Sequence, residues 1–229
     1  MFKKCIAALA LVATSLTAQA DMIGGVEYTP GPFTTVTGAI EQKLNPVTGE
    51  FTVTGSLNTA TGPFTCASCE LTFVMGGYTL AAPPIDGIFS DTYIYTGGTI
   101  DIYVQQAGST DKDLWLALEG HDVDQGFGDY SFIGNVNGFS GSITSLTGTG
   151  YLDVVGGIAA DNFDTNVGID GSDIAFNGSF GSPLYDSQGN LIATGSGDFH
   201  GATIPEPAAV ALFGLGLLGC AAMARRRKA

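Results

Sequence analysis

Positive charge is scarce in the middle of this 229-residue sequence. Lysine and arginine total eight, against 22 aspartates and glutamates. Between Asp21 and Thr203 there are 21 acidic residues and only two lysines, Lys43 and Lys112. So acidic a body repels nucleic acid phosphates and anionic lipid surfaces, which excludes both as expected partners, and it attracts divalent cations or basic partners.

Other absences limit the fold. Charged residues make up only 13 % of the chain, which excludes a coiled coil and charge-driven disorder. The body contains no long segment with the 3.6-residue period of a helix. Its 34 glycines and 45 % hydrophobic residues instead favour one turn-rich β-domain, spanning residues 21–203, with no interdomain linker.

The first 20 residues have the order of a secretory signal peptide. Lys3 and Lys4 precede an apolar run from about Ile6 to Leu16, and Ala18-Gln19-Ala20 follows it. A positive region, a short apolar region and an A-x-A site predict export, with cleavage before Asp21.

The last 26 residues form a second distinct segment, 204–229. Ala208 to Ala224 are 17 residues without a charge, just enough to cross a membrane as a helix. The cations that follow predict a cytoplasmic C-terminus, with the body outside. Pro205 and Pro207 prevent such a helix from extending back into the body.

This C-terminal arrangement resembles a known sorting signal. Pro205-Glu206-Pro207, an apolar stretch and Arg225-Arg226-Arg227-Lys228 occur in the order of the PEP-CTERM signal. The resemblance implies an exported protein of a Gram-negative, exopolysaccharide-producing bacterium. It also implies a membrane-embedded exosortase as partner. The C-terminal helix holds the protein briefly in the inner membrane before the exosortase processes it and the protein is sorted to the surface or matrix. An ordinary single-pass anchor is the alternative interpretation.

Short β-strands dominate the body. Two strands are predicted on either side of a turn built on Asn45, Pro46 and Gly49. The further candidates are rich in Thr, Val, Ile, Tyr or Phe and are bounded by Gly, Asn, Asp or Pro. They are 70–75, 91–95, 99–106, 114–120, 130–136, 141–148, 151–157, 173–180 and 191–199. About ten such strands, with one helical turn at 158–164, predict an all-β antiparallel sandwich or jelly roll.

Cysteine is rare, with four residues in the chain and only Cys66 and Cys69 in the body. In an exported protein this pair predicts a local disulfide. A thioredoxin-like role would need a helix start within a βαβ unit, which the sequence does not supply.

Two aspartate-rich stretches could bind Ca²⁺ weakly, because alternating carboxylates on a flexible loop suit a hard cation. The first contains Asp122, Asp124 and Asp129, and the second contains Asp164, Asn166, Asp170 and Asp173. Neither matches a complete EF-hand loop. The simpler interpretation is that Asp, Asn and Gly form turns at both places, with no cofactor.

No catalytic motif is present, so we expect no enzyme. His121 lies beside Asp122, but adjacent residues of a strand point to opposite faces and would not form a catalytic pair. Trp115 is expected in the core. Tyr93, Tyr95 and Tyr103 follow strand periodicity and could form a one-faced stripe that contacts sugar rings, or could be half-buried.

These observations predict an exported structural or adhesive protein of the extracellular polysaccharide matrix, a role implied by the resemblance. The alternative is a Ca²⁺-assisted carbohydrate-binding module that uses the aspartates and the tyrosines. A less favoured third hypothesis is an exported hydrolase, which would need convergent carboxylates or a histidine in a pocket.

Overall fold

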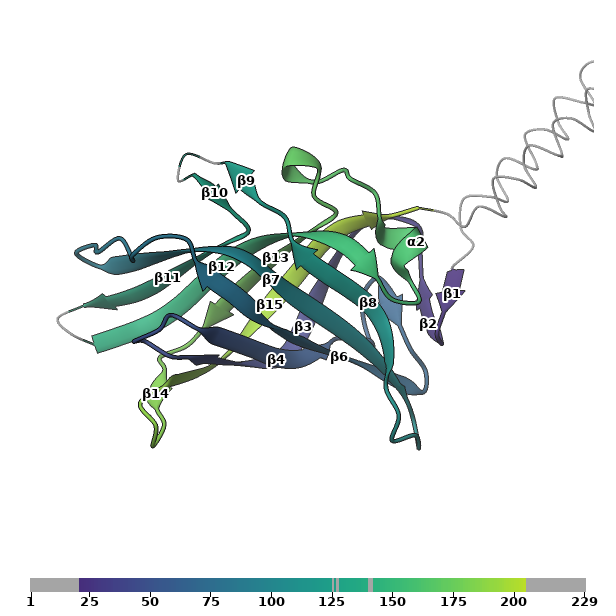
Figure 1. Cartoon of the computed structure of the whole chain (residues 1–229). Coiled ribbons are helices and arrows are strands. Elements are labelled where there is room, and N and C mark those ends of the chain that lie inside the picture. Colours follow the sequence, from purple (N-terminus) through teal and green to yellow (C-terminus); the bar gives the residue numbers. More distant parts are fainter. Residues whose placement is uncertain (1–20, 125, 127, 140–141, 205–229) are drawn as a thin grey trace, which may run out of the picture.

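The computed structural model describes residues 21–204 except 125, 127, 140 and 141 (Figure 1). The predicted signal peptide 1–20, the membrane segment 208–224 and the sorting residues Pro205, Glu206, Pro207, Arg225, Arg226, Arg227 and Lys228 lie outside the described residues. Within the described part of the chain, no helix is both long and apolar enough to cross a membrane.

The described residues are almost entirely β-structure, as predicted. The strands are β1 (Asp21–Ile23), β2 (Val26–Tyr28), β3 (Gly31–Leu44), β4 (Phe51–Leu57), β5 (Phe64–Thr65), β6 (Cys69–Leu80), β7 (Ser90–Gln106), β8 (Asp113–Gly120), β9 (Val123–Asp124), β10 (Asp129–Tyr130), β11 (Phe132–Phe139), β12 (Ser142–Gly156), β13 (Ile174–Phe180), β14 (Leu184–Tyr185) and β15 (Leu191–Thr203). The described helical segments are α2 (Ala160–Phe163), within the predicted helical turn, and the 3-10 turn η1 (Ile169–Gly171).

The main sheet closes into an eight-stranded antiparallel barrel. Strands β3, β4, β6 and β7 follow one another as a meander, and β12, β13 and β15 lead back to β3. Strands β8 and β11 share the eighth place, because each pairs with β7 on one side and with β12 on the other. The predicted sandwich or jelly roll is therefore wrong in architecture, although the antiparallel all-β class is confirmed.

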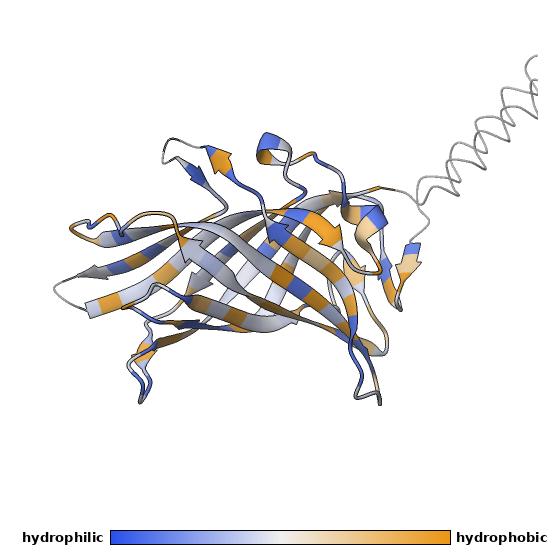
Figure 2. Ribbon diagram, viewed as in Figure 1, coloured by the Kyte–Doolittle hydropathy of each residue, from blue (hydrophilic) through white to orange (hydrophobic). Residues whose placement is uncertain are grey.

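Closure depends on the pairing of β15 with β3, which runs from Leu191 opposite Leu44 to Thr203 opposite Gly31. This pairing leaves the barrel wall without a free edge strand. An unpaired edge could otherwise pair with a strand of another molecule and lead to aggregation. Apolar and polar residues alternate along the strands (Figure 2). Such alternation is common to sandwiches and barrels, so the sequence pattern did not distinguish them.

Two pairs of predicted strands are each one long strand. The segments 91–95 and 99–106 belong to β7, and 141–148 and 151–157 correspond to β12. In β7 the glycines at the predicted break have positive φ, and Gly98 lies opposite Gly77 of β6, which also has positive φ. The two strands therefore bend together at this point without losing register.

One end of the barrel is covered and carries both ends of the described chain. The small sheet β1-β2-β5 and α2 lie there (Figure 1). There Phe64 of β5, Trp115 and Phe163 pack edge to face or tilted, with ring centroids 5.2–5.8 Å apart. Trp115 is 1 % exposed, which confirms its expected place in the core. We call this the terminal end.

Aromatic rings also fill the opposite half of the barrel. Phe51, Tyr95 and Phe132 are mutually in contact, with centroids 4.9–5.9 Å apart. Phe132 lies so close over Gly148 of β12 that any larger residue at position 148 would clash with the ring. Aromatic side chains therefore fill the interior in both halves of the barrel.

Candidate functional site

The outer wall of β12, β13 and β15 carries a row of polar side chains joined across strands. Thr149 Oγ1 donates to Asn177 Oδ1 at 3.0 Å, and Asn177 Nδ2 donates to Asp198 Oδ1 at 3.0 Å. His200 continues the row, since its Nε2 pairs with Asp198 and its Nδ1 lies 2.9 Å from Thr34 Oγ1 of β3. We call these five residues the polar row.

The neighbourhood of the polar row is nearly free of formal charge. The segments 145–151, 174–180 and 191–203 contain one acidic residue, Asp198, and no lysine or arginine. Other outward side chains here are small and polar, such as Thr147, Ser179 and Ser196. Within an otherwise acidic body, this wall presents mainly hydroxyl and amide groups, which suit neutral hydrogen-bonding ligands.

A histidine and an aspartate meet at the junction of β8 and β12. His121 Nδ1 lies 2.8 Å from Asp153 Oδ2, and its Nε2 lies 3.2 Å from the carbonyl oxygen of Asp170. Both partners are acceptors, so the ring makes both bonds only when both nitrogens carry a proton. As expected from the sequence, Asp122 is not the partner of His121; the structure supplies Asp153, which the sequence analysis did not find.

The environment of His121 favours its charged form. Partial burial acts to lower the pKa of His121, but the hydrogen bond and negative charge of Asp153, helped by Asp170, outweigh it and raise the pKa above its ordinary value of 6.5. With both ring nitrogens engaged, His121 joins β8, β12 and η1 and is poorly arranged to act as a general base.

The first aspartate stretch forms a hairpin. Asp124 and Asp129 lie opposite each other in β9 and β10, and Asp124 Oδ1 accepts a bond from the amide of Gly126 at 3.0 Å. Val123 and Tyr130 of the same hairpin pack on Ile94 in a small second core outside the barrel. The structure thus assigns turn and packing roles to this hairpin, while Asp122 is exposed.

The second stretch is organised around Asp173, which is 3 % exposed. Its Oδ1 accepts from the amides of Thr165 and Asn166, at 2.6 and 2.5 Å, and its Oδ2 accepts from the amide of Val154 at 2.8 Å. Asp164 Oδ1 accepts from the side-chain amide of Asn166 at 3.0 Å. The carboxylate of Asp173 therefore holds the loop through three backbone amides.

Neither stretch assembles a set of metal ligands. Across residues 21–204, apart from the four positions left out, no three histidine, cysteine, aspartate or glutamate side chains gather in a group that could hold a metal ion. The Ca²⁺ hypothesis stays a prediction, without support from this geometry. Cys66 and Cys69, by contrast, form the predicted disulfide.

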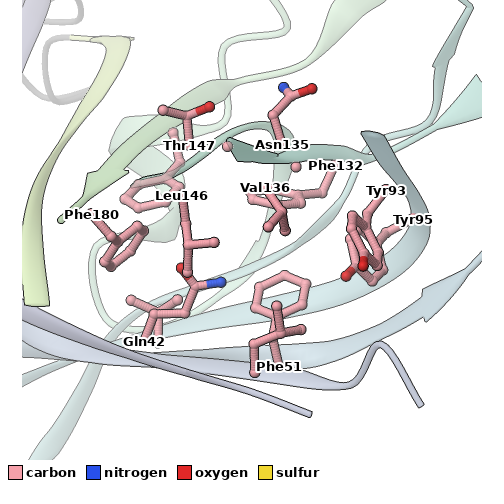
Figure 3. Close-up of a pocket in the computed structure, with 15 residues that line it drawn as sticks. Gln42, Phe51, Tyr93, Tyr95, Phe132, Asn135, Val136, Leu146, Thr147 and Phe180 are labelled. Carbon is pink, nitrogen blue, oxygen red and sulfur yellow. The ribbon is translucent and has the colours of Figure 1, made fainter. Parts of the chain in front are cut away.

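A recess opens between β3, β4, β7, β11, β12 and β13 (Figure 3). It lies in the half of the barrel away from the terminal end. Gln42 points into it among Phe51, Val136 and Leu146 (Figure 3). The free volume is about 20 Å³, enough for a water molecule or two but not for a sugar ring. Gln42 Oε1 is buried without a hydrogen-bond partner among the described residues.

Tyr93, Tyr95 and Tyr103 do not form a one-faced stripe, which was one of the two arrangements that the sequence allowed. Tyr93 and Tyr95 line the recess, whereas Tyr103 lies beyond the bend at Gly98 and bonds Asp101 on the other face. Tyr95 is 3 % exposed and donates to the carbonyl of Gly49 at 3.0 Å, and burial raises its pKa. The bend separates side chains that strand periodicity had placed together.

Comparison with known proteins identifies the C-terminal segment. A model of the PEP-CTERM protein-sorting motif matches residues 203–228. The chain carries a PEP-CTERM sorting motif. The PEP-CTERM motif implies an exported protein that exosortase processes and that is sorted to the cell surface. No curated protein and no solved structure matches the chain.

Proposed function

We propose that this PEP-CTERM protein is a structural or adhesive component of the extracellular polysaccharide matrix of a Gram-negative bacterium, and that it binds neutral polysaccharide rather than catalysing a reaction. The sorting motif supplies the destination. The polar row on the wall of β12, β13 and β15 is the observation that carries the choice of ligand.

The chemistry of this wall suits the hydroxyl groups of a glycan. Threonine, serine and asparagine side chains both donate and accept hydrogen bonds, as sugar hydroxyls do. The cross-strand bonds of Asn177 to Thr149 and Asp198 hold these side chains in place, which lowers the entropy lost when a ligand binds. The acidic remainder of the body repels an anionic polysaccharide, so a neutral chain is the better partner.

The hydrolase hypothesis receives no comparable support. The recess has room for only about 20 Å³ and contains no carboxylate or histidine among its lining residues. His121, which pairs with the carboxylate of Asp153, has both ring nitrogens bonded to acceptors. The proposed role needs neither a pocket nor a catalytic group.

Affinity electrophoresis of the full chain tests this function. The gels contain either the neutral or the anionic polysaccharide fraction from the producing cells. We expect retardation by the neutral fraction only, weakened at least threefold by Thr149→Ala with Asn177→Ala. The matched control is Thr52→Ala with Thr54→Ala, two exposed positions on β4. Equal mobility in both gels, or equal weakening by the control pair, would reject the polar row as the binding surface.

A further inference from the structure

The terminal end of the barrel exposes large apolar side chains around the point where the chain leaves for the sorting segment. Met22 of β1 is 66 % exposed, Ile158 in the turn before α2 is 53 % exposed, and Ile204 is 41 % exposed. We call these three residues the apolar face. Larger exposed apolar patches mark protein or membrane contact sites.

The three residues belong to neighbouring elements that are tied together. Ile158 packs against the turn between β1 and β2 at Gly24, so Met22 and Ile158 are carried by segments in contact. The amide of Ile204 donates to the carbonyl of Asn162 in α2 at 2.9 Å. The chain therefore leaves the barrel beside this face, and Figure 1 shows both described ends of the chain at this side of the molecule.

The sequence that follows limits how far this end can be from a membrane. The uncharged segment begins at Ala208, four residues after Ile204. Four residues span at most about 14 Å when fully extended. The headgroup layer on one side of a bilayer is roughly 5–8 Å thick, so it takes up about half of that reach. While residues 208–224 are inserted, the terminal end must lie at or very near the headgroups.

From this geometry we propose that the apolar face docks on the lipid surface of the membrane that holds the sorting segment. Its three side chains enter the boundary between headgroups and acyl chains, as apolar side chains of interfacial proteins do. The occupant is a zwitterionic lipid surface, because the body is acidic and its two lysines, Lys43 and Lys112, cannot neutralise 21 carboxylates. This inference concerns the membrane-held form and is independent of the proposed polysaccharide binding.

Docking has a consequence for sorting. It holds Ile204, the last described residue before the sorting segment, at the membrane surface, where a membrane-embedded processing enzyme acts. Removal of the segment takes away the tether that concentrates the face at the lipid. The acidic barrel then leaves the membrane, because a small apolar contact without an anchor binds only weakly and reversibly.

Fluorescence quenching by brominated lipid tests the orientation. The protein is purified from producing cells that lack exosortase, with its mass checked for loss of residues 1–20 and retention of 205–229. It is reconstituted in vesicles of phosphatidylcholine brominated on the acyl chains. Met22→Trp and Ile158→Trp report on the terminal end, and Val47→Trp, at a position 91 % exposed in the β3–β4 turn, reports on the opposite end. Trp115 is buried in all three variants and gives a constant background.

We expect at least twofold stronger quenching at positions 22 and 158 than at position 47. Adding Ile158→Ser to the Met22→Trp chain should reduce quenching at position 22, because the face then contacts the lipid less. Equal quenching at both ends would overturn the proposal. Quenching at position 22 that is unaffected by Ile158→Ser would also overturn it, since the tether alone would then explain the proximity. Circular dichroism of each variant confirms that the barrel is folded.

Discussion

The side chains of His121 and Asp153, 32 residues apart in the sequence, are joined by a contact of 2.8 Å between Nδ1 and Oδ2. The pair links the end of β8 to β12, on strands that pair with each other in the barrel. The second ring nitrogen contacts the carbonyl of Asp170, so one imidazole connects three elements.

Stability should depend on pH through His121. The pKa of His121 is raised in the folded protein, so the stabilisation is fully present below the unfolded value of about 6.5 and is lost as the pH rises through the folded pKa. Asp153→Asn should cost about 0.5–1 kcal/mol at pH 6, a modest value because the carboxylate is partly exposed, and less at pH 9. Thermal melts across this range measure it, with the exposed neighbour Asp122→Asn as the control. A pH-independent cost would contradict the assignment.

Asp173 should be among the most sensitive polar residues of the body. Its carboxylate accepts three backbone amides and is almost fully buried. Asp173→Ala should destabilise the fold by about 3 kcal/mol, because three buried donors lose a charged partner. Urea denaturation measures the change, and Asp164→Ala, an exposed aspartate of the same loop, should cost less than about 1 kcal/mol. Similar costs for both substitutions would show that the loop does not depend on Asp173.

Calcium should have little effect on the fold. Because the described residues offer no group of three acidic, histidine or cysteine ligands, we expect millimolar Ca²⁺ to leave the melting temperature within about 1 °C of its value in chelator. Scanning calorimetry checks this. A larger rise that Asp122→Ala with Asp124→Ala abolishes would restore the Ca²⁺-assisted carbohydrate-binding hypothesis at the β9–β10 hairpin.

Substitution of Gln42 tests whether its buried side-chain amide lacks a hydrogen-bond partner in the recess. Its Oε1 is buried without a partner among the described residues, and a buried acceptor left unbonded costs about 1–3 kcal/mol. Gln42→Leu should therefore leave stability unchanged or raise it by up to about 1 kcal/mol. Phe51→Leu, in the same recess, should lower stability through lost packing. A clear loss of stability in Gln42→Leu would show instead that ordered water bonds the amide there.

Much of the fold could be predicted from local patterns, and the errors have a common cause. The turn at Asn45–Gly49, the strands around it and the helical turn before Asp164 follow from residues close in sequence. The prediction of two strands in place of β7, and of two in place of β12, was wrong because glycines were interpreted as strand ends. In β7 they instead form a bend, since Gly98 faces Gly77 on the neighbouring strand.

The candidate site was less predictable still. Thr149, Asn177 and His200 are ordinary outward residues of three different strands, and nothing local distinguishes them. They form one row only because β12, β13 and β15 are neighbours in a defined register. The Asp173 carboxylate was similarly interpreted as a metal ligand or a turn residue, because the amides that it binds are 7, 8 and 19 residues away.

The sequence by itself determined the export of this protein and its all-β class. Sorting signals are read as linear segments, and strand periodicity is a property of adjacent residues. Only the tertiary structure decided that the sheet closes, through pairing of β15 with β3, and that the segments carrying Met22, Ile158 and Ile204 meet where the chain leaves the barrel. Both depend on contacts between segments far apart in the sequence, whose free energy comes from joint burial and register rather than from any local preference.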